Sequence, residues 1–89
     1  MTTENQTRVE VVTAVRVIPP YTLEVTFDDG VIRRVDVEPT LTKGIFVPLR
    51  DPALFARVTV DDEAGTVVWP NGADLAPEFL YESGTQISP

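Results

Sequence analysis

The chain has 89 residues, of which 43% are hydrophobic, so it can form one domain with a modest core and is not a disordered segment. It contains no cysteine and no histidine, which excludes disulfide bonds, thiolate chemistry and catalysis by a Ser-His-Asp or Cys-His arrangement. The formal net charge is −7 and the seven basic residues are scattered, which disfavours direct binding to nucleic acid or to an anionic membrane and favours a protein partner with a basic surface.

The first third of the chain alternates between apolar and polar residues, as strands of an antiparallel sheet do. Residues 1–8 are polar and are predicted to fray, and a valine-rich strand is predicted over 9–18. Two further strands are predicted over 21–27 and 31–37. A three-residue loop, Asp28–Gly30, keeps apolar residues opposite apolar residues in this pair, so we expect Gly30 to be left-handed and to form a bulge.

This register predicts the surroundings of two arginines in the third strand. Glu24 is expected opposite Arg34 on the polar face, where the two charges attract. Arg33 is a misfit, because the same register places it on the apolar face opposite Val25. Its side chain is expected either to extend to solvent at an edge of the sheet or to bind something.

The middle of the chain mixes breaks with short elements. Two prolines and a glycine make residues 38–49 irregular, and a short helix is expected over 51–56 with Asp51 as its N-cap and Pro52 at its first position. Short strands over 57–60 and 66–69 are expected to flank an acidic turn. The apolar residues that are expected to anchor the irregular segment to the core are Leu41, Ile45, Phe46 and Leu49.

The stretch from Trp69 to Tyr81 is the most informative part of the chain. Pro70 should end a buried strand, and the Asn71-Gly72 pair should form a turn. Asp74 is expected to cap a helix over 75–82. One face of this helix, formed by Phe79, Leu80 and Tyr81, is expected to pack on the sheet. Gly84 is expected to end that helix, and residues 84–89 to form a loose tail.

These elements predict a small single α+β domain over 9–83. It should have an antiparallel sheet of about five strands, a short helix after the third strand and a C-terminal helix. No apolar run of 18 residues and no signal-peptide pattern occurs, so we expect a soluble cytoplasmic protein that does not associate with membranes.

Three motifs carry a resemblance to a known family. They are Leu23-x-Val25-x-Phe27-x-Asp29-Gly30, Phe46-Val47-Pro48-Leu49-Arg50-Asp51 and Trp69-Pro70-Asn71-Gly72-Ala73-Asp74-Leu75. Over roughly 9–82 the chain resembles the small bacterial family catalogued as domain of unknown function 2442. The resemblance implies a compact α+β domain without an established activity. Some members carry an appended helix-turn-helix, which we do not expect here. Many are encoded beside another small uncharacterised domain, which has prompted a toxin–antitoxin suggestion.

No catalytic residue, metal ligand or cofactor is predicted, and an enzyme is not the favoured interpretation. The acidic pairs and triplets lie in predicted turns, where acidic residues are expected for solubility and turn formation. For Asp36 the structural interpretation is a buried or half-buried carboxylate that accepts backbone N–H bonds, and for Asp74 it is the helix cap. For the Trp69–Tyr81 stretch it is a packing plug. The candidate binding residues under the functional interpretation are Arg33, Asp36, Trp69, Asp74 and Tyr81.

Two functions of different classes remain open. The first is an acidic protein-binding module that docks on a protein partner, with an antitoxin-like role beside a neighbouring small protein, or on a second copy of itself through sheet edges. The second is a small-molecule binder or minor enzyme with a pocket around the Trp69–Tyr81 stretch, which requires a concave site with convergent polar groups.

Overall fold

A computed structural model describes residues 10–88 and confirms the predicted α+β class. The predicted fraying of residues 1–8 lies outside the described residues. The elements in chain order are β1 (Val12–Ile18), β2 (Thr22–Phe27), β3 (Ile32–Asp36), η2 (Glu38–Thr40), η3 (Gly44–Arg50), α1 (Pro52–Phe55), β4 (Thr59–Asp61), β5 (Thr66–Val68), α2 (Pro77–Ser83) and β6 (Thr85–Ser88).

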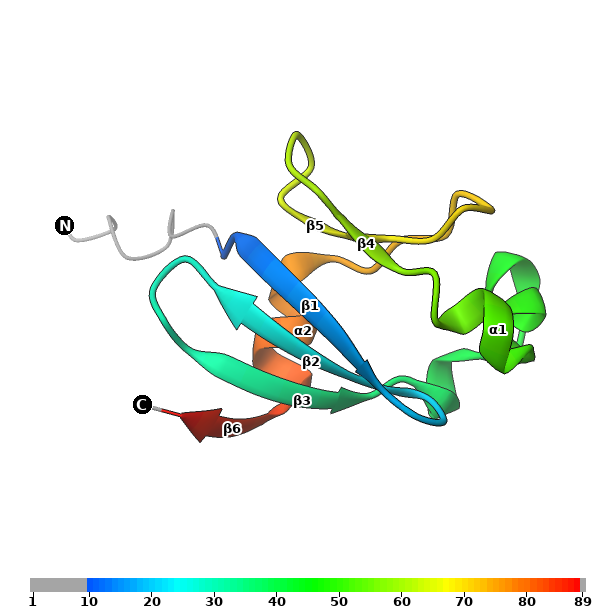
Figure 1. Cartoon of the computed structure of the whole chain (residues 1–89), viewed down its shortest axis with the longest axis horizontal. Coiled ribbons are helices and arrows are strands. Elements are labelled where there is room, and N and C mark those ends of the chain that lie inside the picture. Colours follow the sequence, from blue (N-terminus) through cyan, green and yellow to red (C-terminus); the bar gives the residue numbers. More distant parts are fainter. Residues whose placement is uncertain (1–9, 89) are drawn as a thin grey trace, which may run out of the picture.

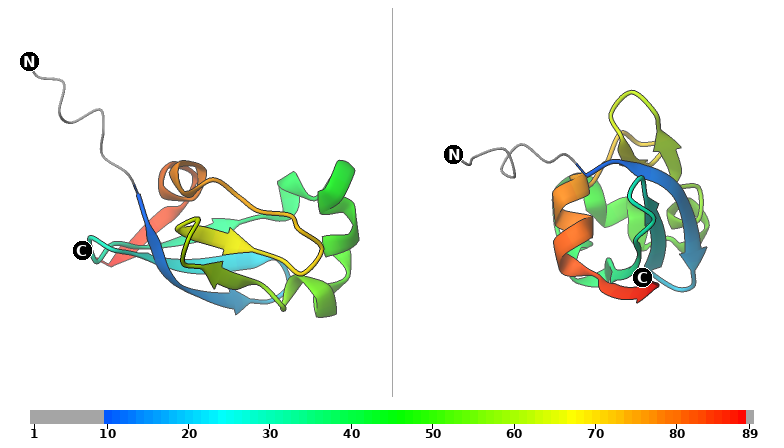
Figure 2. Two further views of the ribbon diagram at one scale, coloured as in Figure 1. Left: turned by 90° about the horizontal axis from the view of Figure 1, so that it is seen from above. Right: turned by 90° about the vertical axis from the view of Figure 1, so that its left-hand side faces the viewer.

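The strands form two antiparallel sheets where one sheet of about five strands was expected. The larger sheet has the order β1-β2-β3-β6, and β4 pairs only with β5. Helix α2 lies across one face of the larger sheet, while η3 and α1 close one end of the molecule (Figures 1 and 2). The opposite face of the larger sheet is not covered by any described element (Figure 1).

The predicted register of the β2–β3 hairpin is confirmed. Glu24 pairs with Arg34 and Val25 with Arg33, and Gly30 has a φ of 90°. The Phe27 N–H donates to the Val31 carbonyl at 2.9 Å, which closes the three-residue loop. This loop length therefore sets which side chains of both strands face the core.

The same loop geometry recurs at the predicted Asn71-Gly72 turn. The Trp69 N–H donates to the Ala73 carbonyl at 2.9 Å, and Gly72 has a φ of 93°. The Asn71 Oδ1 accepts from the Ala73 N–H at 3.1 Å, as the corresponding aspartate oxygen does in the first loop. Both turns thus combine a side chain that accepts a backbone N–H with a glycine that tolerates a positive φ.

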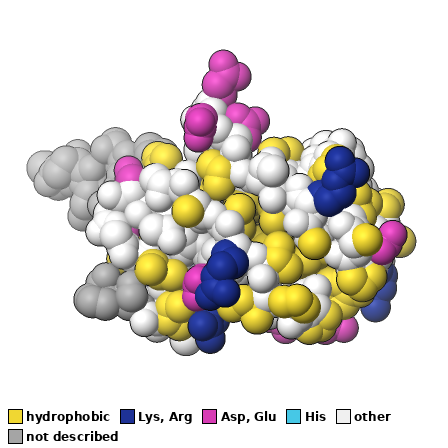
Figure 3. Space-filling view, viewed as in Figure 1, with side chains coloured by type: hydrophobic (Ala, Val, Ile, Leu, Met, Phe, Trp, Pro, Cys, Tyr) yellow, Lys and Arg dark blue, Asp and Glu magenta, His cyan; other side chains and the backbone are white. Residues whose placement is uncertain are grey.

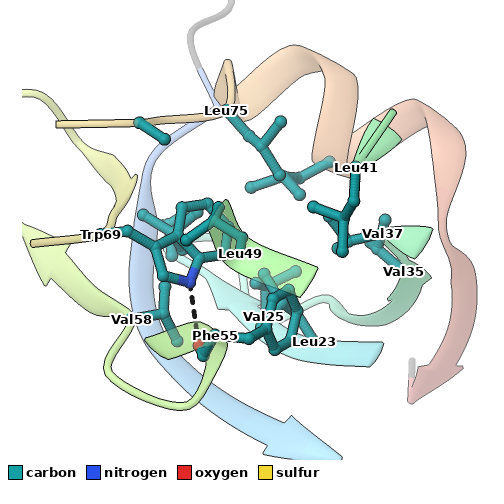
Figure 4. Packing of buried hydrophobic residues seen from close by; sticks show 14 of the residues in the cluster. Leu23, Val25, Val35, Val37, Leu41, Leu49, Phe55, Val58, Trp69 and Leu75 are labelled. Atoms are coloured by element: carbon teal, nitrogen blue, oxygen red, sulfur yellow. Dashed lines mark hydrogen bonds between the residues drawn. The ribbon is translucent and has the colours of Figure 1, made fainter. Parts of the chain in front are cut away.

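The core lies between the covered face of the larger sheet and the remaining elements (Figure 4). Trp69 is at its centre: its Nε1 donates to the Phe55 carbonyl at 2.9 Å, and its ring centroid lies 5.5 Å from that of Phe55. This confirms that the strand-end tryptophan is a packing plug. The buried hydrophobic residues are Val12, Leu23, Val25, Phe27, Val35, Val37, Leu41, Leu49, Phe55, Val58, Val67, Trp69, Ala73, Leu75 and Leu80.

The start of the C-terminal helix differs from the prediction. Asp74 was expected as its N-cap, but α2 begins at Pro77 and its N-cap is Ala76, which makes no side-chain cap bond. Because a residue before proline is pushed out of the helical region, Ala76 is extended, with a ψ of 139°, and the helix cannot begin earlier. Asp74 instead forms an isolated antiparallel bridge with Val68.

The end of the chain also differs from the prediction. Residues 84–89 were expected to be loose, but 85–88 form β6, which pairs with β3. Gly84 has an extended backbone and lies against β3, where a Cβ atom would come within 2.9 Å of both Arg33 Cβ and Val35 Cγ2. The missing side chain of Gly84 therefore allows the chain to turn from α2 onto the sheet edge.

This packing predicts that Gly84→Ala destabilises the protein. The added methyl group would push α2 and β6 away from β3, which should cost about 1–3 kcal/mol of the free energy of unfolding. Urea denaturation followed by circular dichroism measures it, with Ser83→Ala at the neighbouring exposed position as the control. A Gly84→Ala midpoint equal to that of the wild type would contradict the close approach.

The uncovered sheet face carries a charged ladder across three strands. Arg16 Nη2 donates to Glu24 Oε1 at 2.8 Å, and Arg34 Nε donates to Glu24 Oε2 at 3.3 Å. The hydrogen bond from Arg16 is the main reason why the pKa of Glu24 lies below its ordinary value of 4.5, with burial opposing the shift and Arg34 adding to it. Both arginine side chains remain more than half exposed, so solvent weakens the ladder.

This shift predicts how stability depends on pH. Because the pKa of Glu24 is lower in the folded than in the unfolded state, its stabilising effect is complete above the unfolded value and is lost as the pH falls through the folded one. Glu24→Gln should therefore flatten the fall in the free energy of unfolding at pH values below about 4.5. Urea denaturation at a series of pH values, with Glu38→Gln as the control, measures this; equal slopes for Glu24→Gln and wild type would refute it.

Candidate functional site

Of the five candidate binding residues, the structure brings together only Arg33 and Tyr81. The Arg33 guanidinium carbon lies 4.6 Å from the centroid of the Tyr81 ring. Arg33 Nη1 donates to the Gly84 carbonyl at 3.2 Å. We call these residues, together with Phe27 and Asp29, the Arg33–Tyr81 cluster. It lies where the C-terminal segment crosses β2 and β3.

Tyr81 connects α2 to the β2–β3 turn. Its hydroxyl donates to Asp29 Oδ2 at 2.8 Å, and its ring meets that of Phe27 edge-on, with 4.8 Å between the centroids. Asp29 Oδ1 accepts from the Val31 N–H at the same time. One carboxylate therefore shapes the turn with one oxygen and holds the helix with the other.

Arg33 is half-buried on the apolar face of β3, as the register predicted. Its Nε is buried and makes no hydrogen bond to any described residue. The rest of the guanidinium lies over the ring of Tyr81 and donates a hydrogen bond to the carbonyl of Gly84. A cation over an aromatic face contributes about 0.5–2 kcal/mol, depending on how far it is desolvated. Arg33 thus contacts the chain's own C-terminal segment, which explains the misfit without a ligand.

The other three candidates lie apart from one another, and each is part of the core or of a local backbone interaction. Trp69 is 2% exposed, so it does not form the rim of a surface groove. Asp36 pairs with Thr22 across the strands and its Oδ1 accepts from the Glu38 N–H at 3.1 Å, which confirms the backbone-bonded interpretation, although the residue is exposed. Asp74 is exposed at its bridge to β5.

The described residues do not enclose a pocket, and no three of their acidic side chains converge as a metal site would require. The described residues can therefore interact with another molecule through exposed apolar side chains, charged groups and strand edges.

The exposed apolar residues of η3 were not predicted from the sequence. Ile45 was expected to anchor this segment but is 48% exposed, and Val47 is 44% exposed. A 3-10 helix has three residues per turn, so the inward positions Phe46 and Leu49 leave their neighbours facing outward. The three-residue spacing between Phe46 and Leu49 was the feature of the sequence that could have predicted this.

The turn that follows Trp69 contacts Ile45, one of the two exposed apolar residues of η3. Asn71 Nδ2 donates to the Ile45 carbonyl at 3.0 Å, and a Cβ on Gly72 would lie 3.8 Å from Ile45 Cδ1. Arg50, at the end of η3, donates from Nη1 to the Leu41 carbonyl at 3.0 Å and accepts from the Tyr21 hydroxyl through its own carbonyl. We call Ile45, Val47 and the exposed residues Lys43 and Arg50 the η3 surface.

Comparisons with known proteins identify relatives of the domain without giving it an activity. Residues 12–86 match the family described as protein of unknown function (DUF2442). The chain does not match any curated protein. Its fold is similar to the crystal structure of Putative DNA Binding Protein NE0471 from Nitrosomonas europaea, with a TM-score of 0.73 and 31% sequence identity over 83% of this chain. The match covers 48% of that protein, so this chain spans about half of its length.

None of the described helices has the length and apolar character needed to cross a membrane.

The Arg33–Tyr81 cluster predicts the effect of Tyr81→Phe. This change removes the hydrogen bond to Asp29 and keeps both ring contacts, so the free energy of unfolding should fall by about 0.5–1.5 kcal/mol. Arg33→Met is the informative companion: it removes the cation–ring contact and the hydrogen bond to the Gly84 carbonyl, but also the unpartnered buried Nε, so its net effect should stay within about 1 kcal/mol. Denaturation midpoints measure both. An unchanged midpoint for Tyr81→Phe would show that the bond does not hold α2 to the turn.

Proposed function

Because the chain belongs to the family described as protein of unknown function (DUF2442), its role must be inferred from its own surface, and we propose that it is a small acidic protein-binding module. In its specific form, the proposal makes the chain the antitoxin-like or regulatory partner of a small protein encoded beside it, acting in the cytoplasm. The candidate residues with polar chemistry have structural roles, whereas apolar side chains are exposed.

The observation that carries the proposal is the η3 surface. Single exposed apolar residues are ordinary, but Ile45 and Val47 are both more than two-fifths exposed within one short element. Hydrogen bonds from Asn71 to the Ile45 carbonyl and from the Tyr21 hydroxyl to the Arg50 carbonyl fix the backbone near both ends of η3, so the pair is held in place before a partner arrives. Hydrophobic side chains reach the surface beside basic ones over the end of the molecule where α1 lies (Figure 3).

Direct binding to nucleic acid is not part of the proposal. The arginine side chains of the uncovered sheet face are engaged with Glu24, and the net charge of −7 repels phosphate. The similar crystal structure is that of a Putative DNA Binding Protein, which points the other way, but this chain spans about half of that protein. A labelled DNA duplex in the partner experiment below tests the point directly.

The alternative of a small-molecule site around the Trp69–Tyr81 stretch has less support. Trp69 is in the core and Tyr81 is bonded to Asp29, and the described residues leave no pocket between them. A ligand would therefore need the core to open at its tryptophan.

The proposal predicts that an acidic substitution on the η3 surface weakens partner capture. Tagged wild type, Val47→Asp and Ala64→Asp are used to capture proteins from the host lysate at about 50 and 300 mM salt, which brackets strong and weak screening. The third protein is the matched control, because it adds the same charge at an exposed position in the β4–β5 turn. Wild type and control should retain one stoichiometric small protein that Val47→Asp loses by tenfold or more.

The captured protein is then purified and titrated against the same three proteins, with light scattering to detect a second copy of the chain as the occupant. Absence of a stoichiometric partner at both salt concentrations would contradict the proposal, as would equal losses for Val47→Asp and Ala64→Asp. Binding of the DNA duplex at moderate salt would replace it with nucleic-acid recognition.

A further inference from the structure

A second exposed feature lies on α2, away from the η3 surface. Phe79 was expected to pack on the sheet with its neighbours, but it is 39% exposed while Leu80 is buried. In a helix, residues 77, 80, 81 and 84 share one side, so Phe79 lies on the opposite, outward side. The outer side of α2 faces solvent along the flank of the molecule and is not covered by another described element (Figure 2).

Two carboxylates lie on the same side of α2 as this exposed ring. Glu78 and Glu82 are one helical turn apart and both are exposed. The bond between Tyr81 and Asp29 places the β2–β3 turn on the opposite, inward side of the helix. Arg33 lies against the Tyr81 ring on that inward side and is half-buried. The outer face of α2 is therefore an exposed aromatic group beside two carboxylates.

We propose that this surface, defined by Phe79, Glu78 and Glu82 and called the α2 surface, docks a basic segment of a partner protein that covers Phe79 with an apolar side chain. The charges select the occupant: lysine or arginine side chains are attracted both by the two glutamates and by the net charge of −7. A second copy of the chain carries the same net charge and is repelled at long range.

The two kinds of group have different tasks at such a surface. The rim carboxylates are exposed, so each adds little affinity but speeds the encounter and makes it sensitive to salt. The aromatic ring supplies the apolar contact that slows dissociation. This division predicts that loss of the ring and loss of the charges affect binding separately.

The α2 surface is independent of the η3 surface in the proposed function. The two lie toward opposite ends of the long axis, with α2 beside the β2–β3 turn and η3 beside α1 (Figure 2). A partner could engage either surface alone, so each can fail without the other.

The test uses fluorescence anisotropy with a labelled synthetic helical peptide of leucine and lysine as the probe. The same peptide with glutamate in place of lysine is the peptide control. The whole chain should bind the lysine peptide, with affinity falling at least tenfold between about 50 and 300 mM salt, and should not bind the glutamate peptide.

Variants then locate the binding site. Phe79→Ala should weaken binding of the lysine peptide at least fivefold. The pair Glu78→Gln and Glu82→Gln should weaken it about tenfold. The matched control pair is Asp62→Asn with Glu63→Gln in the exposed β4–β5 turn, which changes the net charge by the same two units, from −7 to −5, and should change binding less than twofold. Circular dichroism and denaturation midpoints check that each variant is folded.

Three results would overturn the inference. Equal effects of the two charge-neutralising pairs would assign binding to the net charge of the whole molecule. Unchanged binding by Phe79→Ala would remove the apolar contact, and loss of peptide binding by Val47→Asp would place the peptide on the η3 surface. Conversely, Val47→Asp that loses its captured partner but keeps the peptide would leave both proposals standing.

Discussion

The indole N–H of Trp69 donates to the Phe55 carbonyl inside the core, and much of the structure depends on this bond. It joins the end of β5 to α1 at a place where an unpaired N–H or carbonyl would be costly. The loop that follows the tryptophan is then held in position, so that Asn71 reaches the Ile45 carbonyl and fixes η3. A buried contact thereby determines which apolar side chains of the molecule are presented to solvent.

A second constraint acts on the C-terminal segment. Helix α2 is placed by the buried Leu80 and by the hydroxyl of Tyr81 on Asp29, and Gly84 brings the chain against β3 without a side chain in the way. Arg33 is covered as a result, and its cation rests on Tyr81. The residues that looked most like a binding site in the sequence are therefore used to attach one segment of the chain to another.

Function in this domain is better sought in its exposed surfaces than in its polar clusters. The η3 surface is apolar with a basic rim, whereas the α2 surface is aromatic with acidic neighbours. These two surfaces are the basis of the protein-binding roles that we propose. The similar crystal structure is about twice the length of this chain's match, so the domain also occurs within a longer protein.

Local sequence determined the first three strands, the register of β2 with β3 and the three-residue turns. The alternation in β2 and β3, the three-residue loops that end in Gly30 and Gly72, and the Asp51 cap, whose Oδ1 accepts from the Ala53 N–H at 3.0 Å, all follow from neighbours within a few positions. The tertiary structure decided the rest. Pairing of β6 with β3 and the attachment of Arg33 to Gly84 join residues about 50 positions apart. No local period encodes such contacts, because they exist only once the hydrophobic core has brought the segments together.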